Sequence, residues 1–211
     1  MFYGILAALA AVIVGLDQWT KWLTVTHIPS TNGSAVVRAI PGFFHITHIK
    51  NTGAAWSMLE GQTWLFVLVT AAFFAIVGVL IWKKVLQKKF ELVCLAMIAG
   101  GALGNLIDRV VSGAVTDMIR LEFVNFPVFN VADCFVTTGC ALLIVYVLFF
   151  DRPKKSPPEQ DGKAKGKKPK KSKMDSRRFR YGSMATAITA VVAVLVVVLN
   201  VVVSLLADRF P

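Results

Sequence analysis

Five long apolar segments restrict the fold of this chain more than any other feature of its sequence. They cover approximately Phe2–Leu23, Thr63–Trp82, Glu91–Val111, Asn130–Phe150 and Met184–Leu206. A helix that crosses the hydrocarbon core of a bilayer needs about 20 largely apolar residues, and each segment is close to that length. Hydrophobic residues make up 56% of the 211 residues, a share that exceeds the usual range of soluble domains. We therefore predict an all-α polytopic membrane protein.

Positive charge predicts how these segments are oriented. The formal net charge is +11, and most of it lies in residues 151–180, so it says little about the rest of the chain. Short loops rich in Lys and Arg stay on the cytoplasmic side of a membrane. Residues 83–89, which separate the second and third segments, contain four lysines, and the tract after Phe150 is also basic. We expect a cytoplasmic N-terminus, with residues 24–62 and 112–129 outside.

This orientation sorts the polar residues of the first 150 positions onto one side of the membrane. The outer ends of the segments, and the loop between the third and fourth, carry nearly all of the notable polar side chains. They are Asp17, Lys21, Asn51, Asn105, Asp108, Arg109, Asp117, Asn130 and Asp133. Scattered structural polar residues would not be expected to gather at one face, so we predict a functional site there, with Asp117 in a connecting loop.

Asp117 and Asp133 have the chemistry that a hydrolytic site needs. Charge near hydrocarbon is costly unless it is paired or used. Two neighbouring carboxylates cannot both ionise cheaply, so they share one proton, and one acts as a base while the other acts as an acid. Such a pair can activate water and protonate a leaving amide nitrogen. The alternative is that each aspartate caps a helix or pairs with Arg109 or Arg120.

Two further charged pairs lie near these aspartates. Asp17 and Lys21 are four residues apart, so they can form an ion pair on one helix face. Asp108 and Arg109 are adjacent, so they point to different sides of a helix and should have different partners. Arg109 either holds a carboxylate or a substrate carbonyl, or anchors the helix at the membrane interface.

Two asparagines and a run of small residues also lie near the predicted site. Asn130 opens the fourth segment, where it either caps the helix or orients Asp133 or the substrate. Asn51 either donates to a peptide carbonyl or satisfies a turn backbone. The run Gly100–Asn105 brings small residues together, which allows close approach of membrane helices. No Gly-Lys-Ser/Thr follows these glycines, so a phosphate-binding loop is disfavoured.

The first outer segment contains strand-like sequence. Residues 45–50 are β-prone and follow Pro41-Gly42, while residues 30–33 suggest a turn. We expect a small sheet on the membrane surface. Four aromatic residues suit an interfacial position, namely Phe43, Phe44, Trp56 and Trp64.

Neither a metal site nor a disulfide framework is indicated. His45 and His48 are three residues apart in a predicted strand and should face opposite sides, and no His-Glu-x-x-His motif is present. Three cysteines without paired spacing, Cys94, Cys134 and Cys140, favour apolar packing.

The remainder of the chain predicts two further parts. Residues 151–183 form a Lys/Pro-rich cytoplasmic linker, expected to be disordered and able to contact anionic lipid. Nucleic-acid binding is disfavoured because the tract lacks aromatic platforms. Residues 184–211 form an additional transmembrane helix with a short outer tail. This extension is consistent with a gene fusion, a reading-frame artefact or a genuine anchor.

Five ordered stretches of the first 150 residues resemble lipoprotein signal peptidase, the type II signal peptidase of bacteria. They are Asp17-Gln-Trp-Thr-Lys21, Asn51-Thr-Gly-Ala-Ala-Trp56, Gly101-Ala-Leu-Gly-Asn105-Leu-Ile-Asp108-Arg109, Val115-Thr-Asp117 and Phe129-Asn130-Val-Ala-Asp133. The resemblance implies a four-helix transmembrane bundle with a small extracytoplasmic β-sheet in residues 1–150. It also implies a monomeric aspartyl protease of the bacterial inner membrane.

The resemblance carries specific roles as well. Asp117 and Asp133 would be the catalytic pair, and no metal or cofactor would be needed. Asn51, Asn105, Arg109 and Asn130 would line the site, and Asp17 with Lys21 would support it, beside Asp108. The substrate would be a prolipoprotein, cleaved just ahead of a diacylglyceryl-modified cysteine. The competing hypothesis is a non-enzymatic scaffold or a small transporter, but a transporter should place its polar residues at the bilayer midplane.

Overall fold

The structure is a computed structural model that describes residues 1–30, 36–52 and 62–150. These residues form four helices, α1 (Phe2–His27), α2 (Thr63–Trp82), α3 (Lys89–Ser112) and α4 (Val131–Phe149), and three strands, β1 (Val36–Ile40), β2 (Phe44–Asn51) and β3 (Val115–Leu121). All four helices are long and apolar enough to cross a membrane. The first four predicted segments are therefore confirmed, with ends that shift by up to four residues. The predicted linker and fifth helix, Trp56, and most of the predicted turn at 30–33 lie outside the described residues.

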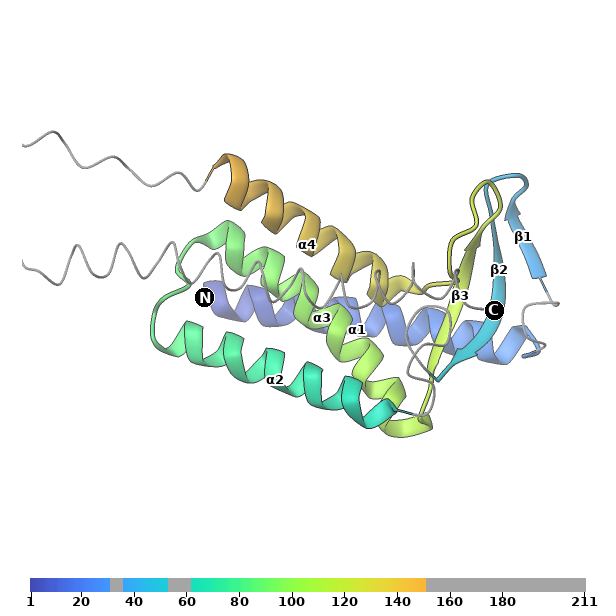
Figure 1. Ribbon diagram of the computed structural model, residues 1–211, viewed down its shortest axis with the longest axis horizontal. Coiled ribbons are helices and arrows are strands. Elements are labelled where there is room, and N and C mark those ends of the chain that lie inside the picture. Colours follow the sequence, from blue (N-terminus) through green and yellow to red (C-terminus); the bar gives the residue numbers. More distant parts are fainter. Residues whose placement is uncertain (31–35, 53–61, 151–211) are drawn as a thin grey trace, which may run out of the picture.

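Helix α3 lies at the centre of the bundle, with α1, α2 and α4 around it (Figure 1). Its apolar window is 50% buried inside the protein, against 11% to 22% for the other three helices. The outer helices instead expose large apolar side chains, as expected for surfaces that face lipid, among them Val12, Leu68, Val79 and Val145. The exposed apolar faces thus belong to the bilayer, and the protein core is built around α3.

Glycines of α3 explain how closely its neighbours pack. A side chain at Gly100 would lie 2.9 Å from the Cβ of Ile13 on α1. A side chain at Gly101 would collide with the backbone carbonyl of Ala132, at the start of α4. The prediction that this run of small residues permits close helix contact is therefore confirmed.

The three strands form an antiparallel sheet in the order β1-β2-β3. The sheet lies across one end of the bundle, at the C-terminal ends of α1 and α3 and the N-terminal ends of α2 and α4 (Figure 1). Gly113 ends α3 in the left-handed conformation (φ 72°), which lets the chain turn directly into β3. The predicted small sheet is therefore present at the end of the bundle where the polar residues gather.

One expectation about this region was wrong. Asp117 does not lie in a connecting loop, because it is the third residue of β3 and is paired with Ile49 of β2. Strand pairing depends on a partner about 70 residues earlier in the chain, which local sequence does not reveal. The opposite edge of β3 is also occupied, since Ile119 and Phe129 exchange backbone hydrogen bonds.

Candidate active site

Two amide side chains connect the carboxylates of Asp117 and Asp133. Asn130 Nδ2 donates to Asp117 Oδ1 at 2.7 Å and to Asn105 Oδ1 at 3.0 Å. Asn105 Nδ2 in turn donates to Asp133 Oδ1 at 2.8 Å. The aspartates come from β3 and α4, so these bonds join a strand to a helix and bring the two acids into one continuous network.

Asn130 has both of the roles left open by the sequence. As the N-cap of α4, its Oδ1 accepts from the backbone N–H of Asp133 at 3.0 Å. The Asp133 carboxylate accepts from the backbone N–H of Asn130 at 3.2 Å, which completes a capping box. The cap does not use the amide Nδ2 of Asn130, and this group donates to Asp117 instead. One fully buried side chain therefore starts the helix and orients both acids.

Asn51 approaches Asp117 from the neighbouring strand. Its Nδ2 donates to Asp117 Oδ2 at 2.9 Å, so each oxygen of this carboxylate receives an amide hydrogen bond. The residues alone offered Asn51 as a donor to a peptide carbonyl or as a turn residue, whereas the resemblance placed it in the lining of the site, where its side chain contacts Asp117. The two residues are 66 positions apart, and antiparallel pairing of β2 with β3 brings them together.

Burial changes the acidity of Asp117. Its side chain is 3% exposed, and burial together with the nearby charge of Asp133 raises its pKa to about 8. The hydrogen bonds from Asn51 and Asn130 and the charge of Lys21 oppose this rise without cancelling it. Burial therefore favours the protonated form of the Asp117 carboxyl over its ionised form.

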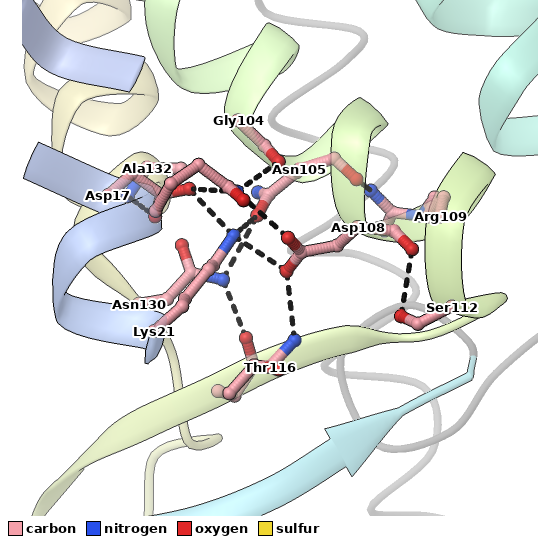
Figure 2. A network of polar contacts seen from close by, with 12 residues as sticks. Asp17, Lys21, Gly104, Asn105, Asp108, Arg109, Ser112, Thr116, Asn130 and Ala132 are labelled. Atoms are coloured by element: carbon pink, nitrogen blue, oxygen red, sulfur yellow. Dashed lines mark hydrogen bonds and ion pairs between the residues drawn. The ribbon is translucent and has the colours of Figure 1, made fainter. Parts of the chain in front are cut away.

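Lys21 joins this network through Asn105, and three acceptors hold its ammonium group (Figure 2). Its Nζ is 2.8 Å from Asp17 Oδ2, 2.9 Å from Asp108 Oδ2 and 2.9 Å from Asn105 Oδ1. An ammonium group has three N–H donors, so all of them are used. Because Asn105 presents its oxygen to Lys21 and Asn130, its nitrogen must face Asp133. The predicted Asp17–Lys21 ion pair is confirmed, and it extends to Asp108.

The two carboxylates that hold Lys21 also tie separate elements together. Asp17 Oδ1 accepts from the backbone N–H of Ala132 at 2.9 Å, which joins α1 to the first turn of α4. Asp108 Oδ2 accepts from the backbone N–H of Thr116 at 3.1 Å, which joins α3 to β3. Gln18 donates to Asp108 Oδ1 at 2.8 Å. Sequence reasoning missed Gln18, although it adjoins Asp17.

Arg109 points away from Asp108, as its adjacent position predicts. Its guanidinium lies over the ring of Phe66 on α2, 4.6 Å from the centroid, and Nη1 donates to the carbonyl of Asn105 at 3.4 Å. Within residues 1–30, 36–52 and 62–150, Arg109 forms no ion pair with a carboxylate, so the carboxylate contact, one of the three alternatives left open by the sequence, is not seen. Its charge still acts on Asp133 and Asp117.

The histidines and two of the three cysteines, Cys94 and Cys140, form no hydrogen bond with this network within the described residues. His48 Nδ1 is hydrogen-bonded to the carbonyl of Ile28 at 2.8 Å. In the part of the chain that the structure describes, no three His, Cys, Asp or Glu side chains are grouped to hold a metal ion. Cys94 and Cys140 are buried as predicted, but Cys134 is exposed, because it lies on an outward face of α4.

Comparisons with known proteins show the family to which this chain belongs. A family profile described as Signal peptidase (SPase) II matches residues 9–149. The chain belongs to the signal peptidase II family. This confirms the resemblance found in the sequence motifs, and it makes the protein a bacterial multi-pass membrane protein of a peptidase family.

The matches to relatives from the same family cover most of the length of each relative. A lipoprotein signal peptidase of Enterococcus faecalis is 40% identical over 147 residues, which are 70% of this chain and 89% of the relative. One from Geobacillus thermodenitrificans is 41% identical over 151 residues, or 70% of this chain and 91% of the relative. A solved bacterial membrane enzyme, determined by the in meso method at 2.3 Å resolution, is 33% identical with a TM-score of 0.63. That match covers 77% of this chain and 95% of the solved one.

Proposed function

We propose that this protein is an aspartic endopeptidase that removes the signal peptide from diacylglyceryl-modified prolipoproteins. Cleavage falls just N-terminal to the lipidated cysteine. The observation that carries the proposal is the hydrogen-bonded connection between Asp117 and Asp133 through Asn130 and Asn105. Family membership supports it, since the relatives are named lipoprotein signal peptidases.

The chemistry follows from the different environments of the two acids. Asp133 acts as the base and removes a proton from a water molecule. The oxygen of that water bonds to the carbon of the scissile carbonyl at the same time. Asp117, which holds a proton at neutral pH because burial raises its pKa to about 8, acts as the acid. It donates this proton to the amide nitrogen as the carbon–nitrogen bond breaks. Proton exchange between the acids and solvent then restores the starting state.

The neighbouring polar residues hold this pair in position. Asn51 and Asn130 orient Asp117, and Asn105 orients Asp133, through the bonds described above. Lys21 fixes Asn105, with Asp17 and Asp108 as its counter-charges. Arg109 has one long hydrogen bond and a ring contact, so its remaining N–H donors face the substrate backbone or the carbonyl that gains charge.

We assign the site to the extracytoplasmic face of the inner membrane, with the N-terminus in the cytoplasm. The lysine-rich connection between α2 and α3 supports this orientation, because it lies at the end of the bundle opposite the sheet (Figure 1). The transporter hypothesis is disfavoured by the same geometry, since the polar network lies at one end of the helices rather than at their middle. A cysteine at exposed Val37 should react with an impermeant maleimide added outside intact cells.

The peptidase unit that we propose consists of residues 1–150. The family profile ends at residue 149, which supports this boundary. Residues 151–183 then serve as a cytoplasmic linker and residues 184–211 as an additional membrane helix. Within this proposal the enzyme acts as a monomer, contacts membrane lipid, uses no metal or other cofactor, and binds no nucleic acid.

A comparison of isosteric variants tests the proposal. Asp117→Asn and Asp133→Asn keep the shape of each side chain but remove its ability to exchange a proton. We expect cleavage of a lipidated prolipoprotein to fall by at least 100-fold in each, given that general acid–base groups contribute about 10²–10⁴ in rate. Asp161→Asn, outside the proposed peptidase unit, is the matched control. Full activity in the Asp133→Asn enzyme would end the proposal, as would equal cleavage of unmodified precursor.

A further inference from the structure

A cavity lies at the far end of the sheet, away from the aspartates. Its volume is about 530 Å³. It is lined by Arg38 of β1, His45 of β2, Arg120 and Leu121 of β3, and the segment 122–126 that follows β3. None of these residues takes part in the network around Asp117 and Asp133, so the cavity is separate from the proposed active site.

Strand pairing places three basic side chains in one row. Arg38 is directly opposite His45, and His45 is directly opposite Arg120. Directly opposed residues of an antiparallel sheet project to the same face, about 5 Å apart. The row therefore concentrates positive charge on one wall of the cavity, although Arg38 and Arg120 are 82 positions apart in sequence.

The guanidinium groups of Arg38 and Arg120 have no ion-pair partner among the described residues. Across the three described ranges, Arg38 and Arg120 form no ion pair or hydrogen bond through their side chains. One carboxylate also lines the cavity, that of Glu122, and both of its oxygens are engaged elsewhere. Oε1 is 3.0 Å from His45 Nδ1, and Oε2 accepts from the backbone N–H of Gly42 at 2.7 Å. Two guanidinium groups against one carboxylate leave the cavity with net positive charge.

Glu122 also belongs to the frame of this cavity. The hydrogen bonds from His45 and Gly42, together with the charge of Arg38, lower the pKa of Glu122. Its ionised carboxylate therefore clamps the segment after β3 onto the turn between β1 and β2. The guanidinium groups remain available to an incoming anion.

Exposed aromatic rings surround the charged row. Phe43 and Phe123 are 51% and 61% exposed, and their rings stack 5.1 Å apart. Phe126, which also lines the cavity, is similarly exposed. This end of the sheet extends past the start of α4 (Figure 1). In the membrane orientation proposed above, it would lie beside the bundle at the level of the bilayer surface. Aromatic side chains at such a position insert at the level of lipid headgroups.

We propose that this cavity binds the phosphodiester headgroup of an anionic phospholipid, with Arg38 and Arg120 on the phosphate. Guanidinium groups recognise phosphate oxygens through paired N–H donors. The phenylalanine rim favours a lipid over a soluble phosphate, because an anion without acyl chains leaves these rings in water. The bound lipid would hold the sheet against the membrane. This proposal goes beyond the peptidase activity and does not depend on it.

Lipid retention by the purified full chain tests this site. The protein in detergent is mixed with equal amounts of phosphatidylglycerol and phosphatidylcholine, and the lipids that stay bound are identified by native mass spectrometry. The wild type should retain phosphatidylglycerol preferentially. In R38Q/R120Q that preference should fall roughly tenfold or more, because each arginine near anionic lipid contributes about fivefold to binding.

A matched variant and a competitor separate this site from general charge attraction. K50Q/K83Q also removes two cations, one at the other end of β2 and one at the opposite end of the bundle, and should keep the preference. Inorganic phosphate at millimolar concentration should not displace the lipid. Equal retention of both lipids by the wild type, unchanged preference in R38Q/R120Q, or displacement by phosphate would overturn the proposal. Thermal unfolding checks the fold, and if the double variant unfolds, R38Q and R120Q alone should each lower the preference about fivefold.

Discussion

Replacing Lys21 by methionine removes the one cation that Asp17 and Asp108 share. Lys21 is 4% exposed, and its carboxylate partners are 0% and 9% exposed. Methionine fills a similar volume but leaves both carboxylates buried without the ion pairs that they form with Lys21. Breaking a buried pair in this way costs about 3–5 kcal/mol, whereas an exposed pair contributes about 0–1 kcal/mol. We therefore expect Lys21→Met to lower the free energy of unfolding by about 3–5 kcal/mol, a large part of a typical total of about 5–15 kcal/mol.

Unfolding in mixed micelles, followed by helical circular dichroism during titration with a denaturing detergent, measures this loss. The control is Lys50→Met, which changes an exposed lysine and should shift stability by less than about 0.5 kcal/mol. The double variant D17N/K21M should lose less than Lys21→Met alone. Asparagine keeps an oxygen for the N–H of Ala132 but carries no charge.

Catalysis gives an independent readout of the same residue. Without Lys21, Asn105 loses the contact that fixes its amide orientation, so its hydrogen bond to Asp133 weakens. We expect kcat to fall while KM changes little, because Lys21 does not contact the substrate in our proposal. A loss of stability under 1 kcal/mol, or losses in D17N/K21M that simply add, would refute the reasoning that Lys21 is a buried counter-ion.

Three further predictions concern pH, packing and the end of the chain. Because the pKa of Asp117 is raised to about 8, its acid form is lost above that pH, so kcat/KM should decline there. The folded state resists this ionisation more than the unfolded state does, so the free energy of unfolding of the wild type should also fall as pH rises toward 8. Asp117→Asn should not show that fall when unfolding is followed in urea or detergent titrations. Gly104→Ala should abolish folding or cleavage, because the added Cβ would lie 2.5 Å from an Asp17 oxygen. In the control Gly78→Ala, the added Cβ meets nothing within 4 Å. This control should stabilise α2 by up to about 1 kcal/mol, measured by thermal unfolding. Truncation after Phe150 should leave cleavage of lipidated precursor intact, and lost activity in a correctly inserted truncation would show that the extension matters.

The sequence predicted the helices well because hydropathy is a local property of the chain. Each membrane segment could be found without knowing its neighbours, and the Asp17–Lys21 pair follows from helix geometry alone. The N-cap role of Asn130 is local as well, since it depends on the three residues that follow.

What the sequence could not predict depends on contacts between distant segments. The strand around Asp117 exists because β2 pairs with it, and Asn51 reaches that carboxylate only through this pairing. The same limit applies to Gln18, which meets Asp108 across 90 positions. The sequence left Arg109 open between a carboxylate, a substrate carbonyl and an interfacial anchor, and its position over the ring of Phe66 likewise depends on a segment distant in sequence.

Helix α1 supplies neither acid of the proposed pair, yet the geometry of the pair depends on it. Asp17 holds the first turn of α4, which carries Asp133, and Lys21 holds Asn105, which bonds to that same carboxylate. Asp108, the other counter-charge of Lys21, fixes the start of β3, which carries Asp117. The charged residues of α1 and α3 therefore set the positions of both backbones that present the acids. Substitutions at these charges should change the rate of cleavage without any contact with the substrate.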